Sequence, residues 1–195
     1  MTNKSKQKPK LVTSWKQMLT LLLAFIIPFS VITILFNIFL SDYVVPSASM
    51  ETTLMTGDQV FAYNLQSTWT PERGKIVVFT DSLGWLKNEP KYSNPQFLVK
   101  RVVGLPGDTI MCCDAQGALV INGYSYPETY TQGVNPTFPL QTVPEGHIFV
   151  LGDNREVSAD SAYHIQDGTQ FIDIKNVKSI PFLRYWPLNT WSGLN

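Results

Sequence analysis

The sequence predicts a mainly β domain, with an antiparallel sheet that is bent or barrel-like, behind one N-terminal transmembrane helix. Residues 18–40 form an apolar stretch of 23 residues without a charged side chain. After it, short runs rich in Val, Ile, Phe and Tyr alternate with Gly, Pro, Asp and Asn, which is typical of strands joined by turns. No stretch beyond Leu40 has a convincing helical period, and this favours an almost all-β domain.

Residues 18–40 are predicted to be a transmembrane helix. At ~1.5 Å per residue a helix of this length spans about 35 Å, slightly more than the hydrocarbon core of about 30 Å. A cleaved signal peptide is the alternative, but its apolar region is normally shorter, about 7–15 residues. Five lysines and no acid lie within residues 1–17, so we expect this basic tail to be cytoplasmic and residues 41–195 to be extracytoplasmic.

Short strands are expected along the rest of the chain. They lie at residues 59–64, 75–80, 97–103, 109–113, 118–121, 147–151, 170–174 and 177–184. Gly-Asp pairs before several of these runs are expected to form turns, and Asn122-Gly123 between two apolar runs predicts a two-residue hairpin. Because the region around residues 109–146 is rich in Gly and Pro, we expect an irregular inserted lobe there.

Charge and composition argue against several kinds of site. The chain has 15 basic and 15 acidic residues, and setting aside the five tail lysines leaves 10 basic residues against 15 acidic ones. A mildly acidic domain argues against nucleic-acid binding, which requires a basic patch. With only His147, His164 and two cysteines as nitrogen and sulfur ligands, we expect neither a metal site nor a cofactor.

The two cysteines, Cys112 and Cys113, are adjacent in the sequence. Neighbouring Cα atoms lie about 3.8 Å apart across a trans peptide, whereas disulfides usually join Cα atoms about 4.4–6.8 Å apart. We therefore expect no bridge between them, and interpret both as packing residues or free thiols.

Lys100 is a candidate general base. In a strand, Leu98, Lys100 and Val102 share one face, so apolar side chains flank the amine. Burial lowers the pKa of a lysine from about 10.4, and a base at neutral pH needs a value of roughly 7–8. The alternative is that Lys100 lies on an edge strand and its amine reaches water.

Ser49 is a candidate nucleophile, because a neutral lysine amine within hydrogen-bond reach can activate a serine. Ser47 could add a hydroxyl donor for the developing oxyanion, and Met50 and Leu54 could offer apolar contact to a substrate or lipid. By itself this run is also typical of a polar loop after a membrane helix. A conventional triad of serine, histidine and aspartate is the alternative mechanism. Its candidate residues are His147, His164, Asp153 and Asp160.

Four segments follow the apolar helix in a defined order. They are residues 46–50 (PSASM), 73–79 (RGKIVVF), 100–108 (KRVVGLPGD) and 152–161 (GDNREVSADS). Each segment alone is modest, but the ordered set closely resembles the bacterial type I signal peptidases, peptidase family S26. The resemblance covers the chain from the anchor to about Ser161.

This resemblance implies the signal-peptidase β fold and a Ser/Lys dyad. Ser49 would be the nucleophile and Lys100 its general base, and Ser47 would complete the oxyanion hole with the Ser49 amide. Ser158 would orient the lysine, and Asp160 would support the active-site loop. The same loop contributes three further supporting residues, Asp153, Asn154 and Arg155.

The resemblance also implies the reaction and its place. Exported preproteins would be cleaved after small residues, through an acyl-enzyme, to release their signal peptides. The enzyme would work at the outer surface of the bacterial cytoplasmic membrane. Its partners would be preprotein signal peptides and the lipid bilayer, with no cofactor, metal or nucleic acid.

Three positions depart from the family pattern. Thr52 stands where a proline is usual, Ala162 replaces an arginine two residues after Asp160, and Lys75 replaces an acid. These departures suggest a specialised member, such as a processing peptidase of a pilus or conjugation system. A non-catalytic membrane-tethered β module that binds exported chains is the alternative from another class. A self-cleaving repressor is disfavoured by the anchor.

Overall fold

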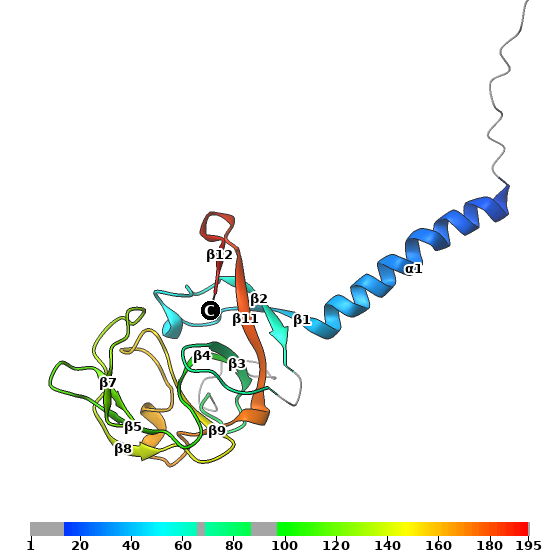
Figure 1. The fold of residues 1–195 in the computed structure, drawn as a ribbon. Helices are drawn as coiled ribbons and strands as arrows, with labels where there is room; N and C mark the ends of the chain where they lie inside the picture. Colours follow the sequence, from blue (N-terminus) through cyan, green and yellow to red (C-terminus); the bar gives the residue numbers. More distant parts are fainter. Residues whose placement is uncertain (1–13, 66–68, 87–96, 195) are drawn as a thin grey trace, which may run out of the picture. The chain divides into compact units, whose positions relative to one another are not determined.

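The computed structural model describes residues 14–65, 69–86 and 97–194. The chain divides into two compact units, residues 1–38 and residues 39–195 (Figure 1). Most of the basic tail predicted at residues 1–17 lies outside the described residues. The prediction of a mainly antiparallel β fold behind one N-terminal apolar helix is confirmed.

Helix α1 extends over Trp15–Phe39, three residues earlier at its start than the apolar stretch. By length and composition it can cross a membrane. The hydroxyls of Thr20, Ser30 and Thr33 each donate to the carbonyl oxygen four residues earlier, at 2.8–2.9 Å. Because a bilayer offers no water to these groups, the internal bonds make the polar side chains compatible with a lipid environment.

The larger sheet contains eight strands within the described part of the chain, and all its neighbouring strands are antiparallel. Across the sheet follow β1 (Leu40–Val44), β2 (Gln59–Asn64), β11 (Val177–Trp186), β3 (Ile76–Thr80), β4 (Phe97–Gly104), β9 (His147–Leu151) and β10 (Ile172–Asp173), and β12 (Ser192–Gly193) pairs with β11. The long strand β11 runs beside β2 and β3 (Figure 1). Strand β4 is therefore an interior strand, between β3 and β9.

The expectation of an irregular lobe at about residues 109–146 needs correction, because the segment between β4 and β9 forms a smaller sheet of four strands. Its order is β7 (Tyr124–Tyr126), β6 (Leu119–Ile121), β5 (Thr109–Cys112) and β8 (Phe138–Thr142). The predicted hairpin between β6 and β7 is confirmed. Asn122 and Gly123 both have positive φ, 54° and 81°, as a two-residue turn of this kind requires.

The sequence prediction missed β1, β8 and β12. β1 begins directly after α1. Its first residue, Leu40, was assigned to the apolar stretch, and no strand was predicted for residues 41–44. β8 contains Pro139, which lowers the strand signal because proline cannot donate to a ladder. Four short 3-10 helices also lie among the described residues, η1 (Ala48–Met50), η2 (Tyr163–Ile165), η3 (Ile174–Asn176) and η4 (Leu188–Thr190).

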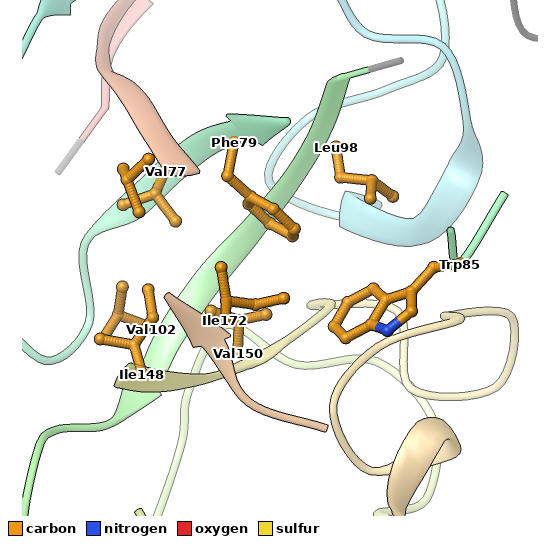
Figure 2. Close-up of a cluster of buried hydrophobic side chains, with 9 residues drawn as sticks. Val77, Phe79, Trp85, Leu98, Val102, Ile148, Val150 and Ile172 are labelled. Atoms are coloured by element: carbon orange, nitrogen blue, oxygen red, sulfur yellow. The ribbon is translucent and has the colours of Figure 1, made fainter. Parts of the chain in front are cut away.

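Buried side chains form three clusters around the two sheets. Figure 2 shows the first, in which Leu98 and Val102 of β4 pack with Val77 and Phe79 of β3 and with Trp85. Val99 belongs to another cluster, as the alternation of side chains along a strand requires. The predicted shared face of Leu98 and Val102 is thus confirmed, and Lys100 lies between them.

Two of the Gly-Asp pairs form the same turn. Asp58 and Asp108 each accept a hydrogen bond from the backbone amide three residues earlier, at 2.8 and 2.6 Å. The preceding glycines, Gly57 and Gly107, have positive φ, which explains why glycine stands there. Both turns are then held by an arginine, Arg184 on Asp58 and Arg73 on Asp108. The prediction of turns at these two pairs is confirmed.

The expectation for the cysteines is wrong. Cys112 and Cys113 are joined by a disulfide, and their Cα atoms lie 3.0 Å apart. The expectation rested on the Cα separation that is usual in disulfides, and that range did not exclude a bridge between neighbouring residues. The peptide bond between these two is cis and their Cα atoms lie closer still than in a trans peptide, yet their sulfur atoms are bonded. The pair ends β5 at the edge of the second core cluster, in which Cys112 is buried.

Gly104 at the end of β4 is a position where a side chain should not fit. A Cβ there would lie 2.9 Å from Phe149 Cβ and 2.9 Å from Val143 Cγ2. We expect Gly104→Ala to lower the free energy of unfolding by about 1–3 kcal/mol, the usual effect of overpacking, measured by urea denaturation in detergent. Gly193→Ala in β12 is the control, since no described atom lies within 4 Å of that Cβ. Equal losses in both variants would contradict the packing account.

Candidate active site

Ser49 lies in the short helix η1, between β1 and the turn that leads to β2. It is 6% exposed, and its backbone carbonyl accepts a hydrogen bond from the Asn154 amide at 3.1 Å. The Ser47 hydroxyl donates to the Ser49 hydroxyl at 3.3 Å. The two serines singled out in the sequence therefore have neighbouring hydroxyls, and the segment that carries them is bound to the loop after β9.

Lys100 lies in the middle of β4 and is 2% exposed. Burial lowers the pKa of its amine to about 8, and the negative charges of Asp160 and Asp153 oppose this shift without overcoming it. The alternative of a lysine that reaches water from an edge strand is wrong, because β4 has a partner on each side.

Ser49 and Lys100 line one cleft with a volume of about 700 Å³. Leu98 from β4 and Ser47 from the serine segment also line it. On another wall the cleft is bounded by Trp85 and by residues of the loop after β9. A second cavity, of about 20 Å³, adjoins the same two serines and is otherwise lined by apolar side chains, among them Met50 and Val99.

Gly152 lies close to both the Ser158 side chain and the backbone of Ser49. A Cβ on Gly152 would meet the Ser158 hydroxyl and would lie 2.5 Å from the Ser49 carbonyl oxygen. The Ser158 hydroxyl is buried, and no hydrogen-bond partner for it is found within the described residues. A buried hydroxyl without a partner is unfavourable, so this oxygen is free to bond to a neighbouring donor, although Ser158 itself does not line the cleft.

Asp160 is 2% exposed. Its carboxylate accepts hydrogen bonds from the backbone amides of Gly152 and Ala162, at 2.9 and 3.1 Å. With Ala162 in place of the family arginine, backbone amides bind this carboxylate. Because Gly152 directly follows β9, its bond to Asp160 ties the far part of the loop back to the end of that strand.

Asp153 forms a buried ion pair in which its carboxylate accepts three hydrogen bonds. Arg101, next to Lys100 but on the opposite face of β4, donates to both of its carboxylate oxygens at 2.8 and 2.6 Å. The Thr53 hydroxyl adds a third bond at 2.5 Å. Although burial alone lowers it, the pKa of Arg101 is raised overall by the hydrogen bond and charge of Asp153. These bonds join β4 to the loop after β9, which carries Asp153, and to Thr53, four residues after Ser49.

Arg155 points away from the cleft into a second buried pair. Its guanidinium donates to both oxygens of Glu128 at 2.7 Å and to the Gly152 carbonyl at 2.9 Å. Glu128 was not among the predicted site residues. It is the only charged residue within 115–144, and an isolated charge in a polar and apolar stretch is the signal that could have identified it.

Met50 and Leu54 are both fully buried and pack in the third core cluster. Met50 also lines the smaller cavity beside the serines. The expectation of substrate or lipid contact at Leu54 needs correction, because its side chain fills the core and lines neither cavity.

The histidines do not assemble the alternative triad. His164 lines the cleft, but its Nδ1 lies 2.8 Å from Asp167, an aspartate that was not among the candidates. Its ring stacks on Trp85. Asp153 is bound by Arg101 and Asp160 by backbone amides, so neither orients a histidine. Among the described residues, no group of three or more His, Cys, Asp and Glu is placed to hold a metal ion.

Comparison with known proteins identifies the family of the chain. Residues 16–186 match the family described as signal peptidase, peptidase S26. A relative from Synechocystis, described as a probable signal peptidase I-2, is 36% identical over 153 residues, which cover 74% of this chain and 62% of that protein. Signal peptidase I P of Bacillus subtilis subsp. natto is 30% identical over 97% of both chains.

A plant protein belongs to the same set of relatives. The probable thylakoidal processing peptidase 2 of Arabidopsis thaliana is 34% identical over 73% of this chain. The match spans 37% of the plant protein, so the chain covers less than two thirds of both this relative and the Synechocystis one.

The buried amine of Lys100 should destabilise the fold in a pH-dependent way. Its pKa is about 8 when folded against 10.5 in the unfolded chain, so between these values the unfolded state binds more protons and stability rises with pH. Below pH 8 the full free-energy cost of burying the charged amine is present. We expect Lys100→Met to raise the free energy of unfolding by about 3 kcal/mol at pH 7, since one pKa unit corresponds to about 1.4 kcal/mol.

The measurement is urea denaturation in detergent at pH 7 and at pH 10. The gain from Lys100→Met should shrink strongly between the two, whereas Lys175→Met, at an exposed lysine, should show no such trend. A gain of the same size at both pH values would show that the Lys100 amine is not desolvated.

Proposed function

The chain belongs to the signal peptidase family, peptidase S26, and from this membership we propose that it is a membrane-anchored serine endopeptidase that removes N-terminal signal peptides from exported preproteins. The observation that carries the proposal is a buried lysine, with a pKa of about 8, that lines one cleft with a serine. A neutral amine beside a hydroxyl is the arrangement that Ser/Lys catalysis needs.

The proposed reaction begins with Lys100 as a neutral amine. It takes the proton of the Ser49 hydroxyl while the serine oxygen bonds to the scissile carbonyl carbon. The resulting oxyanion would accept hydrogen bonds from the Ser49 amide and the Ser47 hydroxyl. Lys100 then returns the proton to the leaving amine as the peptide bond breaks, and a water molecule hydrolyses the acyl-enzyme by the same route.

Supporting roles follow from the contacts of the loop after β9. Ser158, whose buried hydroxyl approaches Gly152 beside Ser49, would orient the Lys100 amine. Asp160 and Asp153 would hold the ends of this loop through the bonds described above. Asn154 would fix the Ser49 backbone, and Arg155 would anchor the loop to Glu128.

Small side chains are the expected choice at the cleavage site. The cavity of about 20 Å³ beside Ser47 and Ser49 is walled by apolar groups, Met50 among them, and it has room for little more than a methyl group. An extended substrate strand could lie along the cleft and place small residues there.

The chain's place in the cell follows from its anchor. Helix α1 would hold it in a membrane, which the bacterial relatives support. The proposed topology has residues 1–17 in the cytoplasm, residues 18–40 in the bilayer and residues 41–195 outside the cytoplasmic membrane, with residues 109–146 as an inserted lobe. The lysine-rich tail favours this orientation.

Replacing either member of the dyad should abolish cleavage of a preprotein in detergent. Ser49→Ala removes the nucleophile, and Lys100→Ala removes a general base whose contribution is about 10²–10⁴-fold. The rate of signal-peptide release is followed by gel shift, with Lys175→Ala as the control and circular dichroism as the check on folding. Near-normal cleavage by a folded Ser49→Ala or Lys100→Ala variant would end the proposal.

The pH dependence of kcat/KM should identify the base. Because Lys100 must lose its proton to act, kcat/KM should rise about tenfold per pH unit at low pH and level off near the pKa of the free base, which is about 8. A half-maximal value at about 6.5, the ordinary pKa of histidine, would instead implicate His164.

A further inference from the structure

Residues 128–133 of the small-sheet region contact both the loop after β9 and the chain just after Ser49. The Gln132 amide donates to the Asp153 carbonyl at 2.8 Å, and the Arg155 amide donates to the Gln132 carbonyl at 2.9 Å. On the other side, the Thr52 hydroxyl donates to the Tyr130 carbonyl at 3.2 Å. The segment therefore contacts the loop after β9 and also the chain three residues beyond Ser49.

Glu128 supplies the charged part of this contact. Both of its carboxylate oxygens lie 2.7 Å from Arg155 Nη2, and the exposed fractions of the Glu128 and Arg155 side chains are 2% and 1%. The Tyr130 hydroxyl donates a further bond to Glu128 at 2.7 Å. A charge-assisted pair in which one guanidinium nitrogen contacts both carboxylate oxygens is among the stronger hydrogen bonds of a protein, and breaking it leaves an uncompensated buried arginine.

A short path leads from Glu128 to Ser49. Arg155, bound to Glu128, also donates to the Gly152 carbonyl at 2.9 Å. Between these two residues, the Asn154 amide holds the Ser49 carbonyl at 3.1 Å. At Gly152 a Cβ would lie 2.5 Å from the same carbonyl oxygen, so the loop and the serine backbone cannot shift independently.

The base is positioned by different means. Lys100 lies on β4, paired on both sides by β3 and β9, whereas Ser49 lies on a short helix between strands. If the loop after β9 relaxes, the Ser49 backbone moves and the Lys100 amine does not follow. A displacement of about 1 Å between reacting groups can reduce a rate by about 100-fold.

From these contacts we propose that Glu128 is a positioning residue for the Ser49 nucleophile, acting through Arg155 and the loop after β9. This inference rests on the proposed Ser/Lys peptidase function. It assigns a role in the reaction to the small sheet, which contributes no side chain to either cavity within the described residues.

The first test compares Glu128→Gln with Asp108→Asn in preprotein cleavage, at a temperature well below both unfolding midpoints. We expect Glu128→Gln to lower kcat by about 10- to 100-fold with KM nearly unchanged, because substrate contacts stay in place. Asp108→Asn removes the carboxylate of another ion pair, the one with Arg73, and should lower the unfolding midpoint without lowering kcat.

A double variant tests the route. If Glu128 acts through Arg155, the double variant Glu128→Gln/Arg155→Gln should have the same kcat as the single variant with the lower kcat. The fold reductions of the two single variants should not multiply. Multiplied losses would overturn the proposed route. So would a Glu128→Gln protein that is less stable but retains the kcat of the parent.

A second pair of variants keeps the inference testable if Glu128→Gln does not fold. The Tyr130 hydroxyl donates to Glu128 at 2.7 Å, so Tyr130→Phe should fold while weakening the hold of Glu128 on Arg155. We expect a reduced kcat in Tyr130→Phe and the parent kcat in Tyr124→Phe, because Tyr124 is 78% exposed. Equal kcat values in the two variants would overturn the inference. If Ser49→Ala is inactive and Glu128→Gln keeps the kcat of the parent, only the inference about Glu128 is rejected. If Ser49→Ala is active, the proposed peptidase function itself is rejected.

Discussion

Desolvation of one lysine amine is the constraint on which the proposed chemistry depends. Lys100 is enclosed because β4 is an interior strand and because Leu98 and Val102 pack with the cluster around Phe79 and Trp85. This environment penalises the charged amine and lowers its pKa to about 8. The same burial that destabilises the protein therefore makes the amine a base.

The surrounding charges are arranged so that they do not cancel this effect. Asp153 is neutralised by Arg101 on the opposite face of β4, and Asp160 is bound by backbone amides. Within residues 14–65, 69–86 and 97–194, no carboxylate lies within salt-bridge distance of Lys100. The two aspartates raise the lysine pKa by less than burial lowers it, and they serve instead to fix the loop that borders Ser49.

Local patterns predicted much of the fold. The limits of β2 and β9, and the hairpin at Asn122-Gly123, agree with the structure because alternation and turn chemistry are properties of neighbouring residues. Predictions failed where the outcome depends on other parts of the chain. Leu54 is apolar and follows the serine, but core packing places it out of reach of a substrate. The cysteine bridge was missed because the usual Cα separation of disulfides was taken to exclude neighbouring residues.

By itself the sequence determined the protein family and suggested the serine and the lysine of the proposed dyad, because an apolar anchor, strand periodicity and four ordered segments are all features of the residue order. Only the tertiary structure decided how those residues are held. Thr52 lies 78 residues from Tyr130 in the sequence and Glu128 lies 27 residues from Arg155, yet a hydrogen bond joins each pair. The loop that carries Arg155 also contacts the Ser49 backbone. Such contacts depend on how the two sheets pack, and side-chain packing over long sequence separations leaves no periodic signal in the chain.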